Sequence, residues 1–579
     1  MNPSSTSKLR SRSWLDRTDR WGLAHRSSFR AQGFSTHVFE GRPVIGICNS
    51  WSELNHCSLH LKQMAEAVKR GVWSAGGFPL EFPTISLGEL LMKPSTMLYR
   101  NLMSMDVEES IRAHPLDGVV LLGNCDKTVP AQLMGAISAD IPAIMVTAGP
   151  QLRGMWRGQE IGSGTAMRKY WDEYRAGGIG AEEWSEIEGC LVRSAGTCGV
   201  MGTASTMAAL SEALGMALPG SADIPAVDSR RMAAAEESGY RIVALARDNV
   251  CPTQIITAQA LENAIRVNMA IGGSTNAIIH LIAIAGRLGL SLPLTKFDEI
   301  SRATPLLVNV QPSGKYLMED LFYAGGLRAL MKEIVSLLHG DAMTVSGKTI
   351  AENVAQAVCD NRDVIRPLGN PLKPDGGTVV LWGNLAPRGA VIKQSAASTH
   401  LLKHRGRVVV FDGYEDLLRR VNDPTLDVDA KSVMVMKGAG PKGGPGMPEW
   451  GDLPIPEKLL KAGIKDMVRL SDARMSGTSF GTVILHVAPE AAIGGPLAIV
   501  ENGDEIELDV ANRRLELLVS ADEINRRLQA WRPPPPHFER GYGKMYLEHI
   551  LQADQGCDFD FLRATATSGG IGNFAELPP

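Results

Sequence analysis

Three of the eight cysteines stand in short polar turns and could present a thiolate to a metal. Cysteine thiolate is the usual ligand of iron–sulfur clusters and a common ligand of zinc. Each of the three comes at the end of an expected strand or at the start of an expected helix, where open α/β folds bind ligands. A single such cysteine is more simply explained as a small buried hydrophobic residue. Three together favour a metal site, and they are Cys57 in Asn-His-Cys, Cys125 in Gly-Asn-Cys-Asp-Lys and Cys198 in Gly-Thr-Cys-Gly.

The other five cysteines lack such surroundings, and we interpret them as buried residues. Eight cysteines in 579 residues are too few for a disulfide scaffold. No C-x-x-C pair of the zinc-ribbon or ferredoxin kind occurs. These five are Cys48, Cys190, Cys251, Cys359 and Cys557.

A carboxylate and an amine follow Cys125 directly, as Asp126 and Lys127. Oxygen ligands suit Mg²⁺ and sulfur ligands suit iron, so one strand end could serve two different metals. Taken alone, the pair is better explained as an ordinary surface Asp–Lys pair.

Three further segments are rich in glycine, serine or threonine. Residues 471–481 form a turn before an expected strand, and residues 437–450 form a Gly/Pro loop that ends near Glu449. That loop lacks the G-K-[ST] sequence of a phosphate-binding loop. Residues 272–276 lead into a helix, where Ser274, Thr275 and Asn276 are candidate substrate contacts, because amides at a helix start bind carboxylates. A plain helix cap would explain the same residues.

The elements that must hold these residues fall into two regions. In the first, the apolar runs 43–48, 117–122 and 141–147 predict strands of a parallel sheet covered on both faces. Helical patterns accompany them, at 59–72, 204–216 and 276–288.

After residue 370 the strand signals come closely spaced, which predicts a β-barrel-like or sandwich domain. The runs are 378–382, 407–411, 432–436, 482–486, 497–500, 505–510 and 514–519. Residues 367–377 are the natural linker, so we expect a large α/β domain at 1–370 and a β-rich domain at 371–579. The first would carry the metal sites, and the second the serine-rich turn and a closing tail.

Charge and composition argue against several classes of function. The net charge of −4 argues against nucleic-acid binding, which needs a basic face. No apolar stretch approaches the roughly 20 residues that cross a bilayer. Arginines crowd the N-terminus, but no apolar segment follows them as in a signal peptide. A cytoplasmic enzyme that acts on a small molecule is therefore the expectation.

Taken together, the motifs resemble the dihydroxy-acid and sugar-acid dehydratases of the IlvD/Edd family. They occur in the order of that family and run through nearly the whole chain. They are Cys57, LLGNCDKT (121–128), GTCGVMGTAST (196–206), GGSTNA (272–277), GPGMPE (444–449) and SDARMSGT (471–478).

The resemblance implies a ligand set. Cys57, Cys125 and Cys198 match the ligands of an iron–sulfur cluster, usually [2Fe–2S], although three cysteines suit [4Fe–4S] equally. Ser476 matches the proposed base, and Thr478 lies beside it. The Mg²⁺ ligands would be Glu89, Asp126, Lys127 and Glu449, with Lys127 carbamylated so that a lysine can bind a cation.

The resemblance also implies a mechanism and an assembly. Three cysteines leave one iron open as a Lewis acid for the 3-hydroxyl, while Mg²⁺ holds the carboxylate and the 2-hydroxyl of the substrate. A serine alkoxide near the divalent cation is a plausible base. The active site would lie near the subunit interface of a homodimer or homotetramer.

The predicted substrate is a sugar acid such as L-arabinonate or D-xylonate. Residues 97–101, residues 162–165 and the tail at 546–562, which carries His549, look closer to the pentonate dehydratases than to the valine-pathway enzyme. One alternative is a dihydroxy-acid dehydratase of branched-chain amino acid synthesis. A more remote one is a non-catalytic iron–sulfur sensor.

Overall fold

Four parallel strands form the sheet of the N-terminal region. The computed structural model describes residues 9–564. Its sheet has the order β2-β1-β3-β4, and its strands are β1 (Val44–Asn49), β2 (Phe78–Pro83), β3 (Gly118–Gly123) and β4 (Ala143–Thr147).

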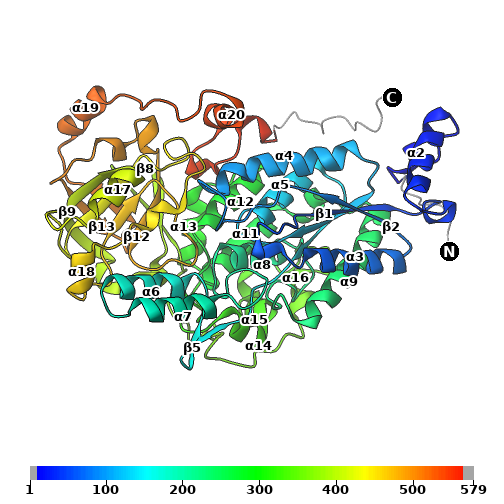
Figure 1. Ribbon diagram of the computed structural model, residues 1–579, viewed down its shortest axis with the longest axis horizontal. Helices are drawn as coiled ribbons and strands as arrows, with labels where there is room; N and C mark the ends of the chain where they lie inside the picture. Colours follow the sequence, from blue (N-terminus) through cyan, green and yellow to red (C-terminus); the bar gives the residue numbers. More distant parts are fainter. Residues whose placement is uncertain (1–8, 565–579) are drawn as a thin grey trace.

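Helices cover both faces of this sheet (Figure 1). Helices α3 (Leu61–Ser74) and α9 (Ser229–Asp248) pack together on one face, and α4 (Met97–Ala113) and α5 (Thr128–Ala139) on the other. Strands β1, β3 and β4 are buried along their whole length because each lies between two helical layers. The predicted parallel α/β region is confirmed.

Strand β2 is absent from the sequence prediction. Its sequence, FPLEFP, contains two prolines, which cannot donate to a neighbouring strand. At the sheet edge one side needs no partner, so the prolines are tolerated there.

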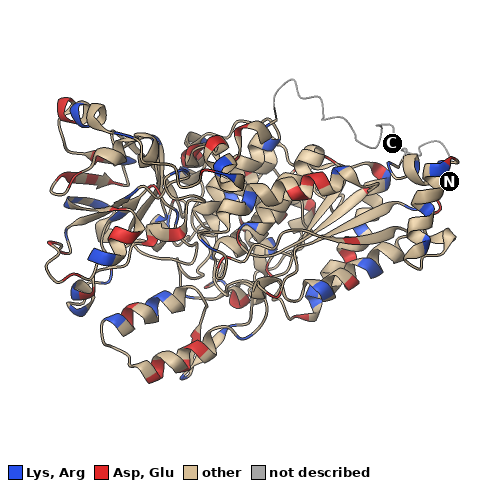
Figure 2. Cartoon of the chain, turned by 45° about the horizontal axis from the view of Figure 1, so that its top comes forward, with Lys and Arg blue, Asp and Glu red and all other residues tan. Residues whose placement is uncertain are grey.

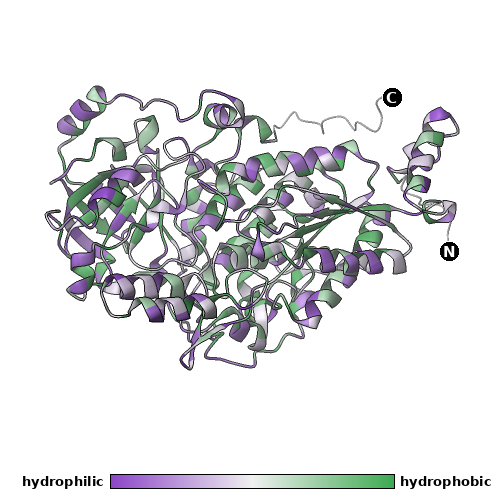
Figure 3. Ribbon diagram, in the orientation of Figure 1, coloured by the Kyte–Doolittle hydropathy of each residue, from purple (hydrophilic) through white to green (hydrophobic). Residues whose placement is uncertain are grey.

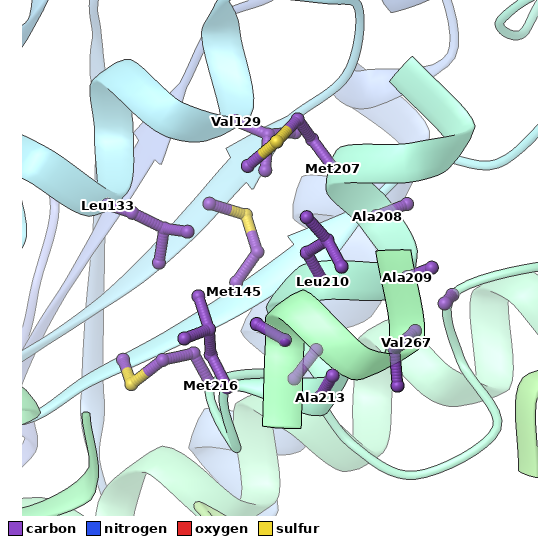
Figure 4. Close-up of a cluster of buried hydrophobic side chains, with 14 of the residues drawn as sticks. Val129, Leu133, Met145, Met207, Ala208, Ala209, Leu210, Ala213, Met216 and Val267 are labelled. Atoms are coloured by element: carbon purple, nitrogen blue, oxygen red, sulfur yellow. The ribbon is translucent and has the colours of Figure 1, made fainter. Parts of the chain in front are cut away.

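A second layer of helices extends the core beyond β4. Met145 of β4 meets Val129 and Leu133 of α5 on one side and Met207 and Leu210 of α8 on the other (Figure 4). The helices of this part are α8 (Thr203–Ala213), α11 (Ala258–Ala270), α12 (Asn276–Arg287), α13 (Leu294–Arg302), α14 (Met318–Tyr323), α15 (Gly326–Glu333) and α16 (Ile350–Val354).

Eight strands close into a barrel in the C-terminal region, in the order β10-β11-β12-β8-β7-β14-β13-β9. This confirms the barrel-like fold rather than the sandwich. The strands are β7 (Val379–Gly383), β8 (Ala386–Ile392), β9 (Lys403–Asp412), β10 (Val433–Lys437), β11 (Arg469–Ser471), β12 (Val483–Ala488), β13 (Glu505–Asp509) and β14 (Arg514–Leu517).

The strand predicted at 497–500 is wrong. This segment is a 3-10 turn, Pro496–Ile499, whose apolar side chains Leu497 and Ile499 are buried against the barrel. Burial alone explains the apolar run, and Pro496 at its start suits a helical turn.

The hydrophobic core of the N-terminal region extends to one side of the barrel, which also has clusters of its own. Val391 of β8 and Val483 and Leu485 of β12 pack in the same cluster as the N-terminal sheet. Apolar residues concentrate in the strands of both regions (Figure 3), while charged residues of both signs are spread over the outer helices (Figure 2). Between residues 9 and 564, no helix combines the length and apolar character needed to cross a bilayer.

The C-terminal tail binds back onto the N-terminal region. Helix α20 (Gly541–His549) lies over the junction of the two regions (Figure 1). Beyond it, Arg100 of α4 donates to the carbonyl oxygen of Cys557 at 2.7 Å. Arg287 of α12 holds Asp558 through two hydrogen bonds of 2.7 and 3.1 Å, and both side chains are buried.

We expect Asp558→Asn to lower the free energy of unfolding by about 3 kcal/mol, because Arg287 would keep a buried charge without its main partner. Asp554→Asn is the matched control. Asp554 pairs with Arg388 at 2.7 Å, but that arginine is 36% exposed, so its loss should cost about 1 kcal/mol or less. Urea denaturation measures both, and equal losses would contradict the prediction.

Candidate active site

The three predicted cysteines lie together at the carboxyl edge of the parallel sheet. Cys57 is in a 3-10 turn (His56–Ser58) after β1, Cys125 follows β3, and Cys198 precedes α8. All three line one cavity of about 140 Å³. The thiols of Cys57 and Cys125 are in hydrogen-bonding contact, and Cys198 is close enough to both to interact with them electrostatically.

The backbone after β3 explains how the cysteine and the carboxylate reach the same cavity. Cys125 has a φ of 75°, the left-handed region that a non-glycine residue seldom adopts. This sharp turn places both Cys125 and Asp126 on the cavity wall. Asn124 supports the turn by donating to the carbonyl oxygen of Cys57 at 2.8 Å.

The surroundings of Cys57 and Cys198 favour the neutral thiol. The contact with Cys125, together with burial, raises the pKa of Cys57 well above its ordinary value. Burial raises the pKa of Cys198 to about 12. Three adjacent sulfurs facing a cavity suit a soft metal centre, and binding one would displace their protons.

Three carboxylates meet beside the cysteines. Oxygens of Glu89, Asp126 and Glu449 lie within 4.8 Å of one another. Lys127 stands among them, fully buried, with its Nζ 3.2 Å from Glu89, 3.4 Å from Asp126 and 3.1 Å from Glu449. Glu449 comes from the C-terminal region, so this group spans both regions of the chain.

Arg474 adds a second positive charge to this group. Its Nη1 lies 3.1 Å from Glu449, and its Nη2 donates to Ser95 at 2.9 Å. Although burial opposes ionisation, Lys127 and Arg474 lower the pKa of Glu449 to about 2. Burial raises the pKa values of Glu89 and Asp126. Carboxylate oxygens are the donors that Mg²⁺ prefers, so the group fits a divalent cation.

Ser476 and Thr478 face the cavity from the loop between β11 and β12. Their hydroxyl oxygens are 2.9 Å apart. Arg168 donates to Thr478 Oγ1 at 2.8 Å and pairs with Asp452 at 2.7 Å. Because arginine only donates, the Thr478 hydroxyl is free to donate its own hydrogen bond to Ser476 Oγ.

The predicted substrate residues 274–276 lie behind the cavity wall. Ser274 is 2.9 Å from Thr203 Oγ1, and Asn276 Nδ2 donates to Thr203 at 3.0 Å and to Glu449 at 3.3 Å. Thr275 is buried. The structure thus places them as supports for Thr203, for Glu449 and for the loop between β11 and β12 that carries Ser476 and Thr478, here called the serine loop. A direct substrate contact stays a prediction.

His549 lies outside this cavity. It ends α20, and its Nδ1 is 3.0 Å from Asp560. Of the residues described for this chain, none from the tail lines the cavity. A role for His549 at the substrate stays a prediction.

The sequence prediction did not single out Arg168, Arg474 or Thr203. Arg474 and Thr203 fall inside the motifs 471–478 and 196–206, so proximity to Ser476 and Cys198 was their available signal. Arg168 belongs to α6 (Thr165–Arg175). This helix lies in the segment between β4 and α8 that also contains β5 (Gly154–Trp156), β6 (Gln159–Ile161) and α7 (Ala181–Leu191). Nothing in its local sequence marks it.

Glu490 fixes the Gly/Pro loop that carries Glu449. Its carboxylate accepts from the backbone N–H groups of Lys442, at 3.0 Å, and Gly443, at 2.8 Å. Burial and the nearby Asp472 raise the pKa of Glu490 from 4.5 to about 7. Between these two values the native state holds a proton that the unfolded chain has lost, so this group's contribution to stability falls as the pH rises.

We expect the stability of Glu490→Gln, relative to the unchanged protein, to increase from pH 5 to pH 8. A glutamine side chain at position 490 cannot ionise. The variant therefore avoids the cost of ionising the buried Glu490, which the raised pKa puts at about 3 kcal/mol. Urea denaturation of both proteins at the two pH values measures the change. A stability difference that does not vary with pH would contradict the prediction.

Most of the chain matches the models of one known protein family. Residues 42–353 match the family model described as dihydroxy-acid/6-phosphogluconate dehydratase N-terminal, and residues 363–557 match the corresponding C-terminal model. The predicted boundary at residue 370 stays a prediction.

Individual relatives cover almost the whole chain. An L-arabinonate dehydratase of Rhizobium leguminosarum bv. trifolii is 54% identical over 96% of this chain and 96% of its own length. A 6-deoxy-6-sulfo-D-gluconate dehydratase of Pseudomonas putida is 49% identical over 96% and 97%. A dihydroxy-acid dehydratase of Ignicoccus hospitalis is 42% identical over 92% and 97%.

Proposed function

Because the chain belongs to the dihydroxy-acid/6-phosphogluconate dehydratase family and is a dehydratase, we propose that it converts an aldonate such as L-arabinonate or D-xylonate to the 2-keto-3-deoxy acid. The observation that carries this proposal is the likeness to sugar-acid dehydratases. Relatives named for sugar acids are 49% and 54% identical to the chain, against 42% for a dihydroxy-acid dehydratase.

We propose that Cys57, Cys125 and Cys198 hold an iron–sulfur cluster, [2Fe–2S] or alternatively [4Fe–4S]. Adjacent thiols beside a cavity support this assignment. Glu89, Asp126 and Glu449 would hold Mg²⁺ together with Lys127. As an ammonium ion Lys127 repels a cation, whereas a carbamate on its Nζ would supply the oxygen donors that Mg²⁺ requires.

When bound, the cluster and Mg²⁺ would supply Lewis acidity for the departing 3-hydroxyl and for the substrate carboxylate and 2-hydroxyl. The chain itself supplies the base. As an alkoxide, Ser476 Oγ would take the proton from C2 while the C3–O bond breaks, and this proton and the departing hydroxide together make up the water lost. The C2=C3 enol that remains gains a proton at C3 and becomes the 2-keto acid.

Arg168 and Thr478 would orient that base. Arg168 holds Thr478 through a hydrogen bond of 2.8 Å, and Thr478 lies 2.9 Å from Ser476 Oγ. A donor aimed at the serine oxygen stabilises negative charge on it, which is needed because serine is a weak base in water.

The cavity mouth supports an oligomer. Leu54, Leu90 and Leu91 line the cavity and are 76%, 58% and 71% exposed. Exposed leucines grouped at one opening are typical of a contact surface. We therefore propose a homodimer or homotetramer whose subunit contact lies near the active site, and sedimentation would report the size of the assembly.

The test is 2-keto acid formation by anaerobically purified protein supplied with Mg²⁺, using L-arabinonate, D-xylonate, D-gluconate and 2,3-dihydroxyisovalerate. We expect fast turnover of a pentonate and little of the branched acid, since a pocket that hydrogen-bonds extra hydroxyls rejects a substrate without them. Preference for dihydroxyisovalerate would assign the enzyme to amino acid synthesis. No turnover with an intact cluster would overturn the proposal and favour a sensor.

A further inference from the structure

Lys393 is a fully buried lysine next to the serine loop. It directly follows β8, and its side chain has no exposure to solvent. Its Nζ donates to the carbonyl oxygen of Gly477 at 3.3 Å. Within residues 9–564, no carboxylate lies within ion-pair distance of it.

Such an amine is costly to bury, because no counter-ion among residues 9–564 offsets the loss of hydration. Burial is the sole cause that lowers the pKa of Lys393, to about 7. The positively charged groups nearby have other partners. Lys373 donates to the carbonyl oxygen of Gln394 at 2.9 Å, and Arg168 donates to Thr478 Oγ1 at 2.8 Å. The cost calls for a role that leucine or methionine could not fill.

The hydrogen bond to Gly477 connects Lys393 to Ser476 through one peptide unit. The carbonyl of Gly477 and the N–H of Thr478 belong to the same amide. That N–H points at Ser476 Oγ, with a nitrogen-to-oxygen distance of 3.4 Å. A positive charge on the carbonyl side polarises the amide, so its N–H becomes a stronger donor to the serine oxygen.

The surrounding contacts prevent this peptide from turning away. A Cβ at Gly477 would lie 2.5 Å from the backbone nitrogen of Thr203 and 2.8 Å from Ser274 Oγ. The loop is therefore pressed against α8 and the start of α12, and its orientation is fixed by packing. The amide dipole between Lys393 and Ser476 is preorganised.

We propose that Lys393 is a positioning residue that acts through the Gly477–Thr478 peptide to lower the proton affinity of Ser476 Oγ. The proposal rests on the proposed function, in which Ser476 takes the C2 proton. Ser476 Oγ then has two polarised donors: the Thr478 N–H, which Lys393 acts on, and the Thr478 hydroxyl, which Arg168 holds.

Lys393→Met tests the proposal on the metal-loaded enzyme. Losing a charge-assisted hydrogen bond of this kind should lower kcat about tenfold at pH 7 with little change in KM. The acid limb of the kcat profile should move to higher pH, because Ser476 would hold its proton more tightly. The kinetic isotope effect with substrate deuterated at C2 should increase.

Lys373→Met is the matched control, since that lysine also donates to a backbone carbonyl but not to the serine loop. Lys393→Gln is the second variant. Its amide can still donate to Gly477, so the fold is supported while the charge is lost, and it should show the same shift in pH profile.

Cluster absorption and unfolding temperature establish that each variant is folded. A uniform loss of rate at every pH with an unchanged isotope effect would overturn the proposal, as would full activity in both Lys393 variants. If the unchanged protein turns over no sugar acid, the proposed function fails. If it does and the Lys393 variants behave like the Lys373 control, this inference alone fails.

Discussion

Cys125→Ser is expected to abolish cluster binding and, with it, measurable dehydration. Serine is nearly the same size, so the buried site should stay folded. Its hydroxyl is a hard ligand that keeps its proton at neutral pH, unlike the thiolate that iron prefers. Only Cys57 and Cys198 would remain in the cavity. Iron and sulfide content, visible absorption and 2-keto acid formation would all fall together.

Cys359→Ser is the control for this change. Cys359 is a half-buried thiol near the carbonyl oxygen of Ile365, away from the cavity. The Cys359→Ser protein should keep full iron content and activity. If the Cys125→Ser protein retained its cluster, the proposal that the three cysteines hold it would be wrong, whatever the activity of the variant.

The sequence predicted the cysteine group because strand ends are local signals. Cys57 and Cys125 follow β1 and β3, and parallel strands bring their carboxyl ends to one edge. Spacing along the chain therefore carried information about closeness in space. Asp126 shares the turn with Cys125, but its surroundings in the sequence suited a surface Asp–Lys pair better, and only the family resemblance predicted it as a metal ligand.

Glu89 and Glu449 could not be predicted as metal ligands from their position relative to strand ends. Glu449 meets Asp126 only because the barrel packs onto the sheet and extends its core, which depends on side chains such as Val391 and Val483. No local pattern encodes that docking. Family resemblance supplied these two residues, and the structure brings their carboxylates together.

The roles of Lys393 and Arg168 could not be predicted from the sequence either. Each acts on the serine loop from a different element, at distances of 3.3 Å from Gly477 and 2.8 Å from Thr478. A lysine after an apolar run reads as the solvent-facing end of a strand, and β8 itself escaped prediction because it contains Pro387 and Gly389. Burial of a charge becomes visible only in the folded chain.

Ser476→Ala is expected to lower kcat by about 10²–10⁴-fold, the range for loss of a positioned base. The substitution removes one oxygen from a cavity wall, so the metal sites and the fold should persist. Iron content should match that of the unchanged protein, in contrast with Cys125→Ser. Exchange of the C2 proton of the substrate with solvent deuterium should vanish, because this exchange needs the base but not the loss of the hydroxyl.

Ser479→Ala separates this role from a general effect on the loop. Ser479 lies three residues away, is buried, and donates to Asp452 at 2.8 Å rather than facing the cavity. Its loss costs one hydrogen bond and should change kcat by a factor of about ten or less. Equal losses in the two variants would mean that the loop as a whole, and not the Ser476 oxygen, limits the reaction. Proton exchange that survives in Ser476→Ala would move the base to another group on the cavity wall.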